Sequence, residues 1–136
     1  MASRYLLDTN HLSAAVKPGS IVRQRIRRHR EKGDRIGTCV PVLCELEVGA
    51  SQVKDPNLYR KILARFLTRI PLWPLDEMTA RIFADIYHDL KSRGKVLSQV
   101  DMMSAALARQ MNLTILTTDR DFDYLEWLPT EDWTKA

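Results

Sequence analysis

Four acidic residues of this 136-residue sequence stand where a carboxylate site could form. Asp8 directly follows a short apolar run, and Asp119 follows a second such run near the other end of the chain. An acid at the end of a buried strand lies at the carboxyl edge of a parallel sheet, where ligands gather. Glu45 and Asp101 lie early in stretches with helical spacing, one after an expected strand and one before another. We therefore expect these four carboxylates to converge at one edge of a sheet.

Converging carboxylates repel one another, and a divalent cation would remove that conflict. A set of oxygen ligands without His or Cys favours Mg²⁺ or Mn²⁺ over zinc. A metal held in this way can orient and deprotonate a water molecule, so the pattern predicts metal-dependent hydrolysis of phosphodiesters. Thr9, Asn10 and Thr117 could hold metal-bound waters or a phosphate oxygen, although each is also an ordinary turn or strand-end residue. Asp121 could be a further outer ligand or could simply help to end the strand before it.

A purely structural role is the alternative interpretation of each acid. Asp8 could cap a short helix over residues 10–16, and Asp101 could form a capping pair with Ser98. Glu45 could be a half-exposed helix residue on a largely apolar side. A phosphatase with Asp8 as its nucleophile is disfavoured, because Asn10 stands where a second Asp would be needed.

The charge of the chain is compatible with a polyanionic partner. The sequence has 21 Lys and Arg against 17 Asp and Glu, which gives a formal net charge of +4, and much of the excess lies within residues 21–35. A basic helix over residues 21–31 could follow a phosphate backbone through Arg27 and Arg30, or it could be a solvated face. The main alternative to an enzyme is therefore a non-catalytic nucleic-acid-binding module that uses this helix.

Composition excludes several other classes of protein. Apolar content of 45% and charged content of 28% are ordinary for a globular protein. No apolar run is long enough to cross a bilayer, so we expect a cytoplasmic protein without a membrane partner. Two cysteines are too few for a disulfide framework or a zinc site.

Helical stretches and short apolar runs alternate along the whole sequence. The expected strands cover residues 4–7, 35–39, 70–73, 113–118 and 126–128, and the expected helices cover 10–16, 21–31, 41–53, 56–69, 77–93 and 98–111. This alternation predicts a single α/β domain over residues 1–136, a three-layer α/β/α sandwich with a short, mainly parallel central sheet.

Four segments of the sequence together resemble one known family. Segments 7–10, 44–49, 101–108 and 117–122 look like the motifs of the PIN domain, and their order and spacing resemble the VapC toxins of toxin–antitoxin pairs. The likeness covers nearly the whole chain. No single segment is specific, but the four in order are.

The resemblance implies a function, cofactors and partners. A protein of this kind is a Mg²⁺- or Mn²⁺-dependent endoribonuclease with a PIN-like fold, and its usual substrates are structured RNAs such as tRNA or ribosomal RNA. It is usually a homodimer, inhibited by a small VapB-like antitoxin whose C-terminal segment occupies the active-site groove. Position by position, Asp8, Glu45, Asp101 and Asp119 match the catalytic and metal-binding acids of the family, and Thr9, Asn10 and Thr117 match its small polar companions.

Overall fold

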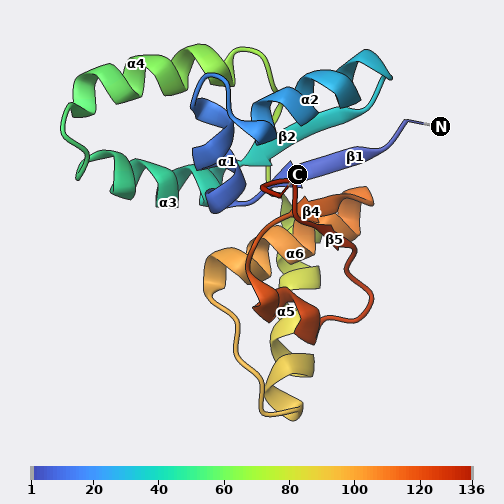
Figure 1. The fold of residues 1–136 in the computed structure, drawn as a ribbon. Coiled ribbons are helices and arrows are strands. Elements are labelled where there is room, and N and C mark those ends of the chain that lie inside the picture. Colours follow the sequence, from blue (N-terminus) through green and yellow to red (C-terminus); the bar gives the residue numbers. More distant parts are fainter. Residues whose placement is uncertain (1, 136) are drawn as a thin grey trace.

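The computed structural model describes residues 2–135 and is built on a five-stranded parallel sheet in the order β3-β2-β1-β4-β5 (Figure 1). The strands are β1 (Arg4–Leu7), β2 (Arg35–Cys39), β3 (Leu72–Trp73), β4 (Thr114–Leu116) and β5 (Thr130–Glu131). β1 is the central strand, and its register pairs Leu6 with Gly37 on one side and with Ile115 on the other. A sheet that is covered on both faces needs strands that are apolar throughout. Leu6, Leu7, Ile115 and Leu116 are accordingly fully buried.

Within the described residues, six α-helices and one 3₁₀-helix surround the sheet. They are α1 (Thr9–Val16), α2 (Ile21–Glu31), α3 (Val40–Ala50), α4 (Pro56–Leu67), α5 (Glu77–Ser92), α6 (Gln99–Met111) and the 3₁₀-helix η1 (Arg120–Tyr124). Figure 1 shows α1, α2 and α4 on one side of the sheet and α5 and α6 on the other. The predicted three-layer α/β/α architecture is therefore confirmed. Among residues 2–135, none of the helices has the length and apolar character needed to span a membrane.

The helix starts follow the capping residues of the sequence. The side chains of Ser20, Asp55, Asp76 and Ser98 each accept a hydrogen bond from a backbone N–H in the first turn of the following helix. Such caps satisfy amides that have no partner within the helix. The sequence signals for these four starts were thus sufficient to place them.

The predicted strand at residues 126–128 is wrong. This segment is a turn after η1, in which the Leu128 N–H donates to the Leu125 carbonyl at 3.1 Å. Leu125 and Leu128 are both buried, so the apolar character that suggested a strand comes from a turn with a spacing of three residues. The actual last strand, β5, follows Pro129 and pairs with β4.

Gly37 in β2 gives a prediction for stability. A Cβ at this position would lie 2.7 Å from the Pro71 carbonyl oxygen and 2.9 Å from the Trp73 ring. The Pro71 oxygen is held in place because it accepts the Thr38 N–H, so Gly37→Ala should lower the free energy of unfolding by about 1–3 kcal/mol. The matched control is Gly49→Ala in α3, where a Cβ meets nothing within 4 Å. This substitution should stabilise the helix by about 0.5–1 kcal/mol. Chemical denaturation of both variants measures the difference, and equal values would contradict the prediction.

Candidate active site

Asp8 lies at the carboxyl end of β1 and is the most buried of the four acids. Its side chain is 4% exposed, and its Oδ2 accepts a hydrogen bond from the Thr117 hydroxyl at 2.7 Å. Its Oδ1 is buried without any hydrogen-bond partner. Although Asp8 occupies the N-cap position of α1, its side chain makes no capping bond. The capping interpretation of Asp8 is therefore wrong, and an unpaired buried carboxylate oxygen calls for another explanation.

The four acids share one electrostatic environment. Burial, and after it the negative charges of Asp8, Asp119 and Glu45, raise the pKa of Asp101 to about 7, against the hydrogen bond from the Ser98 side chain. Burial also raises the pKa of Asp8, with Glu45 and Asp119 adding to the rise and the Thr117 hydroxyl opposing it. Charges perturb one another in this way only at short range. The structure thus places Asp8 and Asp101 within electrostatic range of each other and of Glu45 and Asp119.

Different elements position the other three acids. Glu45 lies on α3 and is exposed, yet its Oε1 accepts the Thr9 hydroxyl at 2.5 Å. Asp101 lies in the first turn of α6, where its backbone N–H donates to the Ser98 hydroxyl. Asp119 follows β4 and caps η1, because its Oδ1 accepts the Asp121 N–H at 2.9 Å. Thus the site joins the ends of β1 and β4 to the middle of α3 and the first turn of α6.

The predicted polar companions of the acids all contact them. Thr117 is the centre of the network: its hydroxyl donates to Asp8 and accepts the Asp119 N–H at 3.0 Å. The Asn10 amide nitrogen lies 3.5 Å from both Asp8 Oδ2 and Thr117 Oγ1. The Asn10 oxygen accepts the Thr118 N–H at 3.2 Å. These bonds fix the acids at the two strand ends relative to each other.

Asp121 has no comparable place in the network. Its side chain is exposed, and its bond to Asp119 is made through its backbone N–H. Its contribution to the site described here is therefore to hold the Asp119 carboxylate through the main chain.

The chemistry of the donors fits a hard divalent cation. In the part of the chain that the structure describes, no three His, Cys, Asp or Glu side chains are placed so that together they could hold a metal ion. The groups that act on the Asp8 carboxylate include the Glu45 and Asp119 carboxylates and the Thr117 hydroxyl, and oxygen ligands are those that Mg²⁺ and Mn²⁺ prefer. Burial and, after it, the negative charge of neighbouring acids raise the pKa of Asp8 and of Asp101, and a bound cation would favour the ionised form of both carboxyls.

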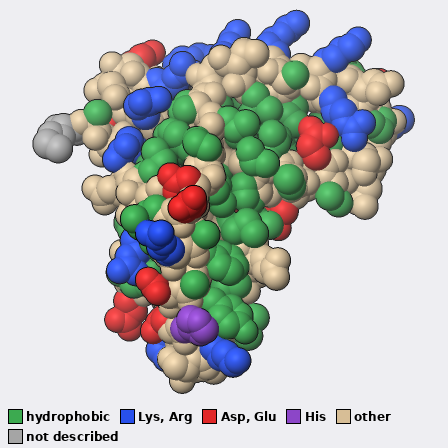
Figure 2. Space-filling view, turned by 180° about the vertical axis from the view of Figure 1, so that it is seen from behind, with side chains coloured by type: hydrophobic (Ala, Val, Ile, Leu, Met, Phe, Trp, Pro, Cys, Tyr) green, Lys and Arg blue, Asp and Glu red, His purple; other side chains and the backbone are tan. Residues whose placement is uncertain are grey.

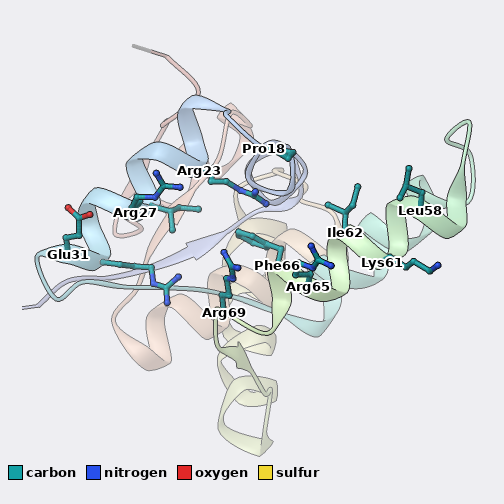
Figure 3. Close-up of a pocket in the computed structure, with 12 residues that line it drawn as sticks. Pro18, Arg23, Arg27, Glu31, Leu58, Lys61, Ile62, Arg65, Phe66 and Arg69 are labelled. Atoms are coloured by element: carbon teal, nitrogen blue, oxygen red, sulfur yellow. The ribbon is translucent and has the colours of Figure 1, made fainter.

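A cationic groove lies between α2 and α4 (Figure 3). It has a volume of about 770 Å³, and its apolar surface comes from residues such as Ile26, Ile62 and Phe66. Its basic side chains are Arg23, Arg27, Arg30, Lys61, Arg65 and Arg69. Figure 3 shows the side chains of α2 and α4 facing each other across this space. We call this feature the cationic groove.

The sequence identified only half of the cationic groove. Arg27 and Arg30 were predicted as contacts to a phosphate backbone, and both line it. Lys61, Arg65 and Arg69 were missed, although their spacing of four residues places them along one face of a helix. Arg23 also has a structural role, because its guanidinium donates hydrogen bonds to carbonyls at the end of α1.

Hydrophobic side chains also gather in the open on the face opposite to that of Figure 1 (Figure 2). Exposed large apolar residues occur on α3, β3 and α5: Val40, Val48, Leu72, Met78 and Tyr87. Isolated exposed apolar residues are common, but an extended apolar area indicates a surface that is covered by a partner.

Comparison with known protein families decides where the chain belongs. The PIN domain family matches residues 5–128, which is most of the chain. The chain belongs to the PIN domain family. A relative from Shigella flexneri, named tRNA(fMet)-specific endonuclease VapC, is 30% identical over 135 residues, which cover 96% of this chain and 98% of the relative. The predicted resemblance to the VapC toxins is therefore confirmed.

Solved structures of PIN-domain toxins share the fold. VapBC2 from Rickettsia felis, bound to a DNA fragment from its promoter, has a TM-score of 0.85 at 24% identity and covers 96% of this chain and 98% of its own. DNA-bound VapBC from Salmonella typhimurium has the same score and identity, with 98% and 99% covered. The likeness to both extends over almost the whole length of this PIN domain.

Proposed function

We propose that this PIN-domain protein is a metal-dependent endoribonuclease and the toxin of a VapBC-type toxin–antitoxin pair. The observation that carries the proposal is the buried Asp8 carboxylate, which has an unpaired oxygen and lies within electrostatic range of three other acids. The relatives that are named as ribonucleases support hydrolysis of RNA as the reaction.

The four acids would hold Mg²⁺ or Mn²⁺. When bound, such an ion supplies charge neutralisation and a more acidic water. The chain itself contributes orientation, because Thr117 fixes the Asp8 carboxylate and Thr9 fixes that of Glu45. In the metal-free protein the pKa of Asp101 lies at about 7, so binding of the ion near neutral pH would displace a proton from its carboxylate.

The test is metal removal and replacement on the purified wild-type protein. We expect saturable binding of Mn²⁺ by titration calorimetry and cleavage of total cellular RNA that EDTA stops and excess Mn²⁺ restores. The tRNA fraction is the first substrate to separate, because the Shigella relative is named for tRNA(fMet). Single-stranded DNA of matched length serves as the control for RNA selectivity. Cleavage that persists in EDTA, or no Mn²⁺ binding, would overturn the metal dependence.

The cationic groove would bind the phosphate backbone of the substrate. It lies at the far end of α1 from the acids, and eight helical residues span about 12 Å, a distance that a bound RNA strand bridges easily. Guanidinium and ammonium groups on both walls of the groove would attract the phosphates of a polyanion. The acids would repel phosphates unless a metal ion is bound between them.

Removal of two groove charges should weaken RNA binding and reduce its dependence on salt. For Arg27→Gln with Arg30→Gln, we expect roughly tenfold weaker binding and a salt slope smaller by about 1.4–1.8, because two phosphate contacts are lost. The matched control is Arg28→Gln with Lys32→Gln, which removes the same charge from exposed positions outside the groove. Fluorescence anisotropy at several salt concentrations measures both pairs. Equal slopes in the two pairs would exclude this role of the groove.

The protein would act with two protein partners. Solved relatives of this chain are VapBC complexes, which supports a VapB-like antitoxin that blocks the toxin. The hydrophobic side chains that gather on the face shown in Figure 2 support a homodimer through that face. A non-catalytic nucleic-acid-binding module explains the cationic groove but not the unpaired Asp8 oxygen, because it needs the acids only as helix caps.

A further inference from the structure

The His11 ring contacts the hydrogen-bond network of the acidic site, and its two ring nitrogens have different roles. The side chain is fully buried on α1, and its Nε2 lies 2.8 Å from the Trp133 backbone nitrogen. A backbone N–H can only donate, so Nε2 must be the acceptor and the ring proton must be on Nδ1. Burial lowers the pKa of His11 to about 4, against the attraction of Asp132, and this keeps the ring neutral.

The Nδ1 proton of His11 points at Asn10. Nδ1 lies 2.6 Å from the Asn10 side-chain oxygen, which also accepts the Thr118 N–H. Two donors therefore meet at the same oxygen. A flipped amide would place its NH₂ group against both donors and its oxygen against the Asp8 carboxylate, so the amide has one favourable orientation.

In that orientation the Asn10 NH₂ group faces the acidic site. It lies 3.5 Å from Asp8 Oδ2 and from Thr117 Oγ1. A continuous series of hydrogen-bonding groups thus runs from the Trp133 backbone through His11 and Asn10 to Asp8. Groups behind a metal-binding carboxylate commonly set its orientation and affinity.

We propose that His11 is a positioning residue of the acidic site, which orients the Asn10 amide toward Asp8 and Thr117 through its Nδ1–H. The proposal rests on the proposed function in one respect, namely that Asp8 binds the metal. A purely structural role is the competing explanation, because the other ring nitrogen anchors Trp133, which is buried against Tyr5 and His29.

Two substitutions separate the two roles. His11→Asn keeps an N–H at the position of Nδ1 and loses the acceptor for Trp133. His11→Gln reaches the position of Nε2 with an oxygen that accepts the Trp133 N–H, and loses the donor to Asn10. A structural role makes the Gln variant the milder change, whereas a positioning role makes it the more harmful one for the site.

The experiment measures three quantities. Long-range ¹H–¹⁵N spectra of the metal-free wild type should show His11 protonated on Nδ1. Side-chain amide signals of Asn10 in the metal-free protein should shift in His11→Gln and stay close to wild type in His11→Asn. Calorimetric Mn²⁺ affinity should fall roughly tenfold in His11→Gln and stay within about twofold in His11→Asn, while the thermal midpoint falls more in His11→Asn.

Several outcomes would overturn the proposal. Protonation of His11 on Nε2 in the wild type would overturn it directly, so this test holds even if His11→Asn fails to fold. Unchanged Asn10 signals and Mn²⁺ affinity in a folded His11→Gln protein do so as well. If the wild type binds no Mn²⁺, the proposed function fails, and the metal-free spectra still decide whether His11 orients Asn10.

Discussion

Asp8→Asn should abolish RNA cleavage without destabilising the protein. We expect the cleavage rate to fall by at least about 100-fold, because the variant loses the charge that would hold the cation. The side chain keeps its volume, and its remaining oxygen can still accept the Thr117 hydroxyl. Burial already disfavours the ionised form of Asp8. Replacement of this carboxylate by a neutral amide should therefore leave the thermal midpoint at pH 8 unchanged or raise it. Cleavage, Mn²⁺ titration and thermal unfolding on one preparation test all three statements.

The matched control for this variant is Asp85→Asn. Asp85 is an exposed acid on α5, far along the chain from the two strand ends, and the substitution changes the net charge equally. It should leave both cleavage and Mn²⁺ affinity at the wild-type level. A purified Asp8→Asn protein that cleaves RNA as fast as this control would remove Asp8 from the mechanism.

The positions of the four acids could be predicted from the sequence because each depends on a local signal. Asp8 and Asp119 follow apolar runs, and parallel topology then brings the ends of those runs to the same edge of the sheet. Glu45 was predicted less well. The sequence placed it along an apolar side, whereas it is exposed and is held toward the site by the hydrogen bond from the Thr9 hydroxyl.

The features that the sequence did not reveal depend on partners that are remote in the chain. The sequence around His11 gives no sign of its role, because its acceptor role depends on Trp133, 122 positions away. The cationic groove joins two helices, of which only α2 had been recognised as basic. The last strand was misplaced for a related reason: β5 has only two residues and no apolar alternation, and its place depends on backbone bonds to β4 rather than on its own side chains.

The pKa of Asp101 predicts opposite effects of pH on folding and on metal binding. The folded protein keeps the Asp101 proton up to about pH 7, whereas an unfolded chain releases it near 3.8. Between these values the folded state binds more protons, so the contribution of Asp101 to the free energy of unfolding falls as the pH rises. Mn²⁺ needs the ionised carboxylate, so its apparent affinity should rise by up to about tenfold per pH unit below pH 7 and level off above it.

Comparison with Asp101→Asn isolates these effects from the other titrating groups. His11, whose pKa is lowered, makes the opposite contribution to stability below neutral pH, but it is present in both proteins and cancels in the difference. We expect equal thermal midpoints near pH 4 and a variant that is more stable by roughly 3–5 °C at pH 8, a modest value because Asp101 is partly exposed to solvent. The variant should also lose most of the pH dependence of Mn²⁺ binding and keep the part due to Asp8. Midpoints that differ by the same amount at pH 4 and pH 8 would show that Asp101 ionises normally. The pKa of its carboxyl group would then be that of an acid on an open surface.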